Sequence, residues 1–315
     1  MSVIQRPQKT GQGDTGKVKN PSQRSRRFQP GGMWWPFALP AIVFVGLFFV
    51  LPFLLNFRLA FTNWSTYSSK IDWNGLYNFE ILQRQGILLE AISITVAYAI
   101  VAMMVQNVVS LLLALALEQT NFINSVFRSI FFIPVLISSV AAGFIWYAML
   151  SPNGPINQII AIFVPGFSHA WFGDARTALL AVAFTDAWKW SGIATLVYIA
   201  GLNAIPKELL EAATIDGASV WQRLTSIRLP LLAPAFTFTI VTTLLGAISA
   251  YDIPAATTRG GPGTATRVLN LAMQQQWTGG YFGTGSALSL VITLIVIFTA
   301  VPLVTYLRRR EVSMQ

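Results

Sequence analysis

The sequence predicts an all-α polytopic membrane protein with six membrane-spanning helices. Of its 315 residues, 54% are hydrophobic and only 10% are charged, whereas soluble globular domains carry about 25% charged residues. The mean hydropathy is +0.58, and six apolar segments reach the length of about 20 residues that a helix needs to cross a bilayer. Because such a chain lacks the polar surface of a soluble protein, we interpret it as a membrane protein.

A polar tail precedes the first apolar segment. Residues 1–33 are rich in Gln, Gly, Ser and basic residues and have no helical periodicity, which predicts a disordered cytoplasmic tail. The tail is too long and too weakly basic for the n-region of a cleaved signal, so we expect the first apolar segment to remain as an anchor.

The expected spans are continuous apolar stretches separated by polar loops. They cover residues 34–57, 88–117, 127–150, 178–202, 231–250 and 286–307. The second is longer than necessary, so we expect it to tilt or to project beyond the membrane. Prolines within spans are tolerated where neighbouring helices satisfy the freed backbone groups.

We divide the chain by these spans. The tail at 1–33 is followed by the first span with its outer loop at 34–87, a core of five spans at 88–309 and a short cytoplasmic end at 310–315.

The placement of Lys and Arg predicts the orientation. If both termini are cytoplasmic, 14 of the 21 basic residues lie inside and 6 lie outside, with Lys189 within a span. Since basic residues are enriched in cytoplasmic loops, we expect both termini and the segment 203–230 to be cytoplasmic.

That segment has the local signals of two short helices. Pro206 suits the first turn of a helix, and Asp216 with Gly217 forms a stop signal. Ser219 and Gln222 have the spacing of a capping box, which predicts a second helix. The segment therefore predicts a helix–turn–helix elbow on the membrane surface, with an apolar stripe offered to a partner.

The elbow also carries a motif with fixed spacing. Glu211-Ala-Ala is followed by Gly217 and then by Ile227, Leu229 and Pro230. This pattern resembles the E-A-A-x3-G-x9-I-x-L-P loop of the permease subunits of binding-protein-dependent ABC importers. The resemblance implies a type I importer transmembrane domain whose loop couples to an ATPase subunit. The implied coupling residues are Glu208, Glu211, Ala212, Ala213, Asp216, Gly217, Ile227, Leu229 and Pro230.

A second loop narrows the resemblance. Gly260-Gly-Pro262 with Thr266, before the last span, is similar to a loop of the carbohydrate-uptake permeases, the maltose- and glycerol-phosphate-permease-like branch. The resemblance implies sugar uptake across a bacterial inner membrane. It also implies a second permease, two ATP-binding subunits and an extracytoplasmic binding protein. The chain itself would then be no enzyme, need no cofactor and bind no nucleic acid.

Charged and aromatic residues inside the spans are candidates for the solute path. Asp186 and Lys189 share a face of the fourth span, where charges mark either a pathway or a stabilising pair; we leave both readings open. Trp188 and Trp190 offer flat faces suited to a sugar, but they point about 200° apart, so at least one faces elsewhere. The full candidate set is Gln106, Asn107, Asp186, Trp188, Lys189, Trp190, Tyr198, Tyr251 and Asp252.

Other functions receive less support. The chain has no cysteine and a single histidine, His169, so thiol chemistry is excluded and neither a metal-ligand cluster nor a catalytic constellation is recognisable. A permease for glycerol phosphate, a polyamine or a peptide remains an alternative to a sugar permease. A secondary transporter would need ion-coupling groups and usually an internal repeat, and none is evident.

Overall fold

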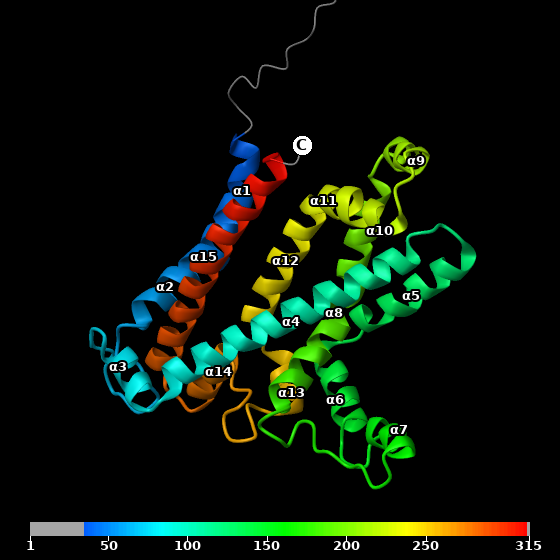
Figure 1. The fold of residues 1–315 in the computed structure, drawn as a ribbon. Coiled ribbons are helices and arrows are strands. Elements are labelled where there is room, and N and C mark those ends of the chain that lie inside the picture. The colour runs from blue at the N-terminus through cyan, green and yellow to red at the C-terminus, as the bar shows by residue number, and fades with distance from the viewer. Residues whose placement is uncertain (1–34, 314–315) are drawn as a thin grey trace, which may run out of the picture. The chain divides into compact units, whose positions relative to one another are not determined.

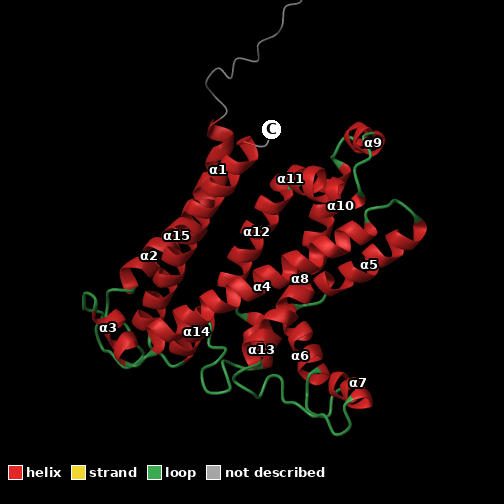
Figure 2. Ribbon diagram, viewed as in Figure 1, coloured by secondary structure: helices red, strands yellow, loops and turns green. Residues whose placement is uncertain are grey.

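The computed structural model describes residues 35–313, and all regular elements in this range are helices (Figure 2), as predicted. The predicted basic tail lies outside the described residues. Within this range, three helices are long and apolar enough to cross a membrane by themselves, and up to six spans result if each bent pair of helices counts as one.

The described part of the chain divides into two units, one that ends at Val50 and one that begins at Leu51. In the described part of the first unit, α1 (Trp35–Val45) continues into the π-helix η1 (Gly46–Val50). The apolar segment Ala38–Leu59 is long enough for a span, in agreement with the first predicted span.

The second unit contains the remaining helices (Figure 1). They are α2 (Leu51–Leu59), α3 (Tyr77–Arg84), α4 (Ile87–Leu117), α5 (Phe122–Leu136), α6 (Ser139–Met149), α7 (Pro155–Phe163), α8 (Ala178–Asn203), α9 (Lys207–Ile215), α10 (Val220–Arg223), η2 (Leu224–Arg228), α11 (Leu229–Leu231), α12 (Ala233–Ile248), α13 (Asp252–Thr257), α14 (Leu269–Thr278) and α15 (Phe282–Ser313).

Helices α4 and α8 form the centre of this unit. The buried face of α4 consists mostly of small residues, and all but one of the intervals between its members are three or four: Ala91, Thr95, Tyr98, Ala99, Ala102, Gln106, Ser110, Ala114 and Leu117. Small residues allow membrane helices to approach closely, and hydrogen bonds then join them. Accordingly, Ser110 Oγ donates to the carbonyl of Ser191 at 2.9 Å, and Gln106 Nε2 donates to that of Trp190 at 3.2 Å.

The third expected span, 127–150, is not one continuous helix. It consists of α5 and α6, which meet at an angle of 104°. Pro134 lacks an N–H and weakens the end of α5, and Ile137 and Ser138 then adopt extended backbone angles. Ser138 Oγ accepts from the N–H of Ala141 at 3.1 Å and so caps α6. The break is therefore built into the local sequence, whereas the residues that pack around it come from other parts of the chain.

The elbow has the predicted helix–turn–helix form, in α9 to α11. Gly217 has φ of +78°, and the N–H groups of Gly217 and Ala218 donate to the carbonyls of Thr214 and Ala213 at 3.1 and 2.9 Å. These two bonds make a Schellman motif that ends α9. The predicted capping box is also present: the N–H of Gln222 donates to Ser219 Oγ, and its Oε1 accepts from the N–H of Ser219.

Candidate functional site

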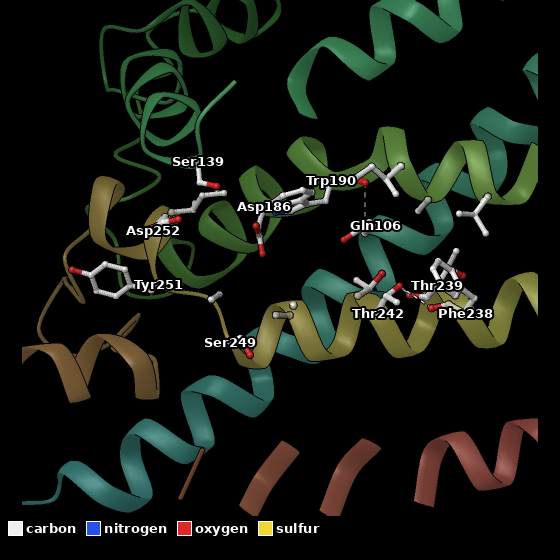
Figure 3. A pocket seen from close by; sticks show the side chains of 18 residues that line it. Gln106, Ser139, Asp186, Trp190, Phe238, Thr239, Thr242, Ser249, Tyr251 and Asp252 are labelled. Atoms are coloured by element: carbon white, nitrogen blue, oxygen red, sulfur yellow. Dashed lines mark hydrogen bonds between the residues drawn. The ribbon is translucent and has the colours of Figure 1, made fainter. Parts of the chain in front are cut away.

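A cavity of about 370 Å³ lies among α4, α8, α12 and α13 (Figure 3). Its lining combines carboxylates, hydroxyls, an amide and three aromatic rings. The lining residues are Gln106, Ser139, Asp186, Trp190, Ile193, Ala194, Val197, Phe238, Thr239, Thr242, Thr243, Gly246, Ala247, Ser249, Ala250, Tyr251, Asp252 and Ile253.

Five of the nine sequence candidates line this cavity: Gln106, Asp186, Trp190, Tyr251 and Asp252. They come from α4, from α8 and from the start of α13, so segments distant in the sequence meet here (Figure 3). The structure therefore brings these five together around one space, and the other four lie outside the lining.

Asp186 is held in place from α4. Its Oδ2 accepts a hydrogen bond from the hydroxyl of Tyr98, a fully buried side chain, at 2.9 Å. The bond from Gln106 to the carbonyl of Trp190 lies one turn further along α8. Two polar contacts between α4 and α8 thus fix this wall of the cavity, and Trp190 as a whole residue remains 38% exposed.

Lys189 faces away from the cavity lining. Its side chain is only 2% exposed, and Nζ donates to the carbonyls of Ile137 at 2.8 Å and Val135 at 3.3 Å. It also lies 4.3 Å from the centroid of the Trp190 ring. Lysine thereby satisfies carbonyls that the break after α5 leaves free, at the negative end of that helix.

A direct ion pair of Asp186 with Lys189, one of the two readings that the sequence left open, is therefore not formed. Among the ion pairs of the described residues, none joins these two side chains within 4.0 Å. Each side chain has a partner on another helix instead, Tyr98 for Asp186 and the end of α5 for Lys189.

Close packing of α5 against α8 supports the capping of α5 by Lys189. A Cβ atom added to Gly192, one turn after Lys189, would lie 2.7 Å from the carbonyl oxygen of Phe131 and 3.1 Å from Cα of Phe132. Only glycine permits this approach. The end of α5 is therefore held against α8 by both a contact of backbones and a charge.

The other three candidates pack within the helix bundle. The hydroxyl of Tyr198 donates to Asn107 Oδ1 and accepts from Thr239 Oγ1, each at 2.7 Å. Trp188 packs edge-on against Trp146, with ring centroids 5.5 Å apart. This arrangement agrees with the expectation from helix geometry that Trp188 and Trp190 do not both face the same side.

A threonine face of α12 was missed by the sequence analysis. Thr239, Thr242, Thr243 and Gly246 follow at intervals of three, one and three residues and all line the cavity. That spacing puts them on one side of a helix, so the signal was present in the fifth span. Ser139, at the start of α6, was also missed, because only the break after α5 brings it to the cavity.

The lining suits binding rather than covalent chemistry. It contains two carboxylates and several hydroxyls, and the lining residues include no Lys, Arg, His or Cys. Carboxylates and carbonyls accept hydrogen bonds from hydroxyl groups, while the exposed aromatic rings offer apolar faces. Such a surface fits a polyhydroxylated solute.

The elbow forms a second candidate site. Of its motif residues, Glu208, Glu211, Ala212, Asp216 and Gly217 are exposed, whereas Ala213, Ile227, Leu229 and Pro230 are half-buried. Large apolar side chains project beside the motif: Ile215, Val220 and Trp221 are 86, 74 and 70% exposed. An exposed apolar group on a rigid turn is typical of a protein-docking surface.

Membrane-spanning helices around a polar cavity, with a docking elbow between two spans, define a membrane transport subunit. The profile of one family, described as binding-protein-dependent transport system inner membrane component, matches residues 106–312. The chain belongs to this family.

Individual proteins agree with this assignment. The probable starch degradation products transport system permease protein AmyD of Thermoanaerobacterium thermosulfurigenes is 28% identical over 93% of this chain and 100% of its own length. The trehalose/maltose transport system permease protein MalF of Thermococcus litoralis is 32% identical over 87% and 93%. A crystal structure of a bacterial ABC transporter involved in alginate import shares the fold, with a TM-score of 0.76 at 20% identity, over 87% of this chain and 94% of that one.

The chain is thus a permease subunit of an ABC importer and not an enzyme. A component of such a binding-protein-dependent system works with a second permease, ATPase subunits and a solute-binding protein.

Proposed function

We propose that this subunit forms, with a second permease, the path for ATP-driven uptake of an uncharged sugar, and that the cavity among α4, α8, α12 and α13 is part of that path. The observation that carries the proposal is the cavity lining. There the ring of Trp190 lies beside Asp186 (Figure 3), and a row of threonines lines the cavity from α12. The elbow would dock on an ATPase subunit and convert its closure into alternating access.

The names of two relatives support sugar as the solute class. AmyD and MalF are permeases for starch degradation products and for trehalose and maltose. Both match this chain over nearly their whole length, so the similarity extends across the helices that line the cavity.

The charge of the cavity lining helps to distinguish a sugar from the alternative solutes. Asp186 and Asp252 line the cavity without a basic residue of this chain, and Lys189 is engaged with α5. A phosphorylated solute such as glycerol phosphate would meet repulsion from these carboxylates and no cation from this chain. A polyamine fits the charge, but the aromatic surfaces and the relatives favour a sugar.

We further propose that both termini and the elbow are cytoplasmic. The support is the excess of Lys and Arg on that side. The elbow and the outer helices α3, α7, α13 and α14 also lie at opposite ends of the second unit (Figure 1).

The solute class is tested by uptake into proteoliposomes that contain the complete transporter and its binding protein. We expect ATP-dependent accumulation of radiolabelled maltose or trehalose and none of sn-glycerol 3-phosphate. Accumulation of glycerol phosphate alone would contradict the proposal.

A matched pair of variants tests the role of the cavity. Thr242 lines the cavity, and Thr237 on the same helix does not. Thr242→Ala should weaken uptake about fivefold, in line with the loss of one hydrogen bond of about 1 kcal/mol. Thr237→Ala should leave it unchanged. Equal effects would exclude this face of α12 from the path.

A further inference from the structure

An ion pair joins the elbow to the C-terminal end of α4, away from the exposed side of the elbow on which a partner would dock. Nη2 of Arg228, in η2, donates to both carboxylate oxygens of Glu118, at 2.7 and 2.9 Å. The two side chains are only 26% and 21% exposed. Both bonds come from one guanidinium nitrogen and are charge-assisted, so they hold η2 close to the end of α4, and partial burial protects them from screening by salt.

A second arginine fixes the carboxylate side of this contact. Nε and Nη2 of Arg128, on α5, donate to the carbonyl of Leu117 at 2.9 and 2.5 Å, and Nη2 also reaches that of Gln119 at 3.2 Å. Arginine here satisfies carbonyls at the C-terminus of α4. Because the backbone on both sides of Glu118 is held, the carboxylate is a firm attachment point.

Apolar packing lies beneath the pair. Leu229 and Leu210 of the elbow pack against a cluster of buried residues: Ala114, Leu117, Tyr198, Ile199, Leu202, Ile205 and Leu232. The elbow thus has an anchored side toward α4 and α8 and an exposed side with Ile215, Val220 and Trp221. Apolar packing has no fixed direction, so the ion pair supplies the directional contact between η2 and the end of α4.

Helix α4 connects this contact to the cavity. The helix is continuous from Ile87 to Leu117, and Gln106 lines the cavity. Gln106 lies about 18 Å from Glu118 along the axis at 1.5 Å per residue. A displacement of the elbow that is passed to the end of α4 therefore reaches the cavity wall without crossing a loop.

We propose that Glu118 and Arg228 are a positioning pair that ties the elbow to α4 and transmits the nucleotide-driven movement of the elbow to the cavity. The pair contacts neither solute nor nucleotide. Its role is distinct from the docking surface on the exposed side of the elbow.

The test compares the accessibility of the cavity wall in two nucleotide states. No solute is added, so the result does not depend on the identity of the solute. The chain has no cysteine, and Thr242→Cys places a single thiol on this chain in the cavity. The complete transporter, with its partner subunits, is reconstituted in lipid nanodiscs. The rate at which N-ethylmaleimide modifies this subunit is measured by mass spectrometry, without nucleotide and after trapping with ATP and vanadate.

We expect the modification rate to differ about fivefold between the two states in the parent protein, within the usual range of allosteric coupling. Arg228→Gln or Glu118→Gln should reduce that ratio to near one while vanadate trapping persists. The exchanged pair Glu118→Arg with Arg228→Glu should restore most of it. Glu80→Gln, which removes an exposed ion pair with Arg84 on α3, serves as the control and should keep the full ratio.

A merely structural pair would lower the yield of complex but leave the ratio intact in the complexes that assemble, and that result would overturn the proposal. Failure of the exchanged pair to restore the ratio, or no nucleotide effect in the parent, would overturn it as well. If the glutamine variants do not assemble, Arg228→Lys replaces them with the same expectation. It keeps the charge but replaces the guanidinium with a shorter side chain that ends in a compact ammonium group.

Discussion

Lys189 shows how a charge is accommodated within a membrane-spanning helix without an acidic partner in contact. The break between α5 and α6 leaves carbonyls without helical partners in a region where water is scarce. The ammonium group donates to two of them. These hydrogen bonds offset the cost of burying the charge, because the carbonyls would otherwise be buried without partners.

This arrangement makes a prediction that separates it from an acid–base pair. Lys189→Met should lower the yield and thermal stability of the complex, since each unsatisfied buried carbonyl costs about 1–3 kcal/mol. Asp186→Asn should have a smaller effect, because an amide oxygen still accepts from Tyr98. The double variant should be no more stable than Lys189→Met alone.

Melting of the purified complex, followed by intrinsic fluorescence, checks these expectations. Recovery of stability in the double variant would instead show that the two charges compensate each other.

The elbow is the element that local sequence determines most completely. Its turn depends on Gly217, with φ of +78°, and no other atom lies within 4 Å of the position that a Cβ would occupy. A side chain there would therefore meet space in this chain but cost about 1–2 kcal/mol in backbone strain. A large side chain at this position would therefore mainly disturb the contact with the partner subunit that docks there.

Comparison of Gly217→Ala with Gly217→Leu tests this reasoning. Both carry similar backbone strain, but only leucine projects beyond the elbow. We expect Gly217→Ala to retain most binding-protein-stimulated ATP hydrolysis, and Gly217→Leu to lose it or to release the ATPase subunits, with membrane insertion unchanged in both. The measurements are phosphate release and subunit stoichiometry, and equal activity of the two variants would contradict a close contact at Gly217.

The same local logic explains what the sequence could and could not reveal. The caps at Ser219 and Gly217 involve neighbours within five residues, so the elbow was predictable in detail. The break between α5 and α6 has local signals in Pro134 and Ser138, but Lys189, which satisfies its carbonyls, lies more than 50 residues away, so the predicted third span lacked its bend. The threonines of α12 were visible at helical spacing, but threonine in a helix often bonds only to its own backbone, as Thr242 does with Phe238 at 2.7 Å.

For the whole molecule, hydropathy and the family motif were sufficient for the fold class and the transport function. They were not sufficient for the cavity. Asp186 and Tyr98 are 88 residues apart in sequence, and no periodicity indicates that they meet. The charged residues within its span indicated that α8 contributes to a polar site. Only the packing of α4, α8, α12 and α13 determines which of its residues face the cavity.

The orientation of the whole chain gives a further prediction. Single cysteines replacing Ser2, Ser219 or Ser313 should resist a membrane-impermeant maleimide in intact cells, whereas a cysteine replacing Ser69 should react, because positive charge favours the cytoplasmic side. All four should react after the membrane is permeabilised. Reaction at Ser219 from outside would reverse the proposed orientation.

The central claim is that the cavity walled by α8 and α12 carries the solute, and two tryptophans on α8 test it most directly. Trp190 lines the cavity, and Trp188 packs against Trp146 outside it. The measurement is the initial rate of ATP-dependent maltose or trehalose uptake per assembled complex. We predict that Trp190→Ala lowers this rate about tenfold, the effect of losing about 1.4 kcal/mol of contact with the solute. Trp188→Ala should lower the yield of complex but not the rate per complex. A wild-type rate for Trp190→Ala, or an equal loss in both variants, would contradict the claim.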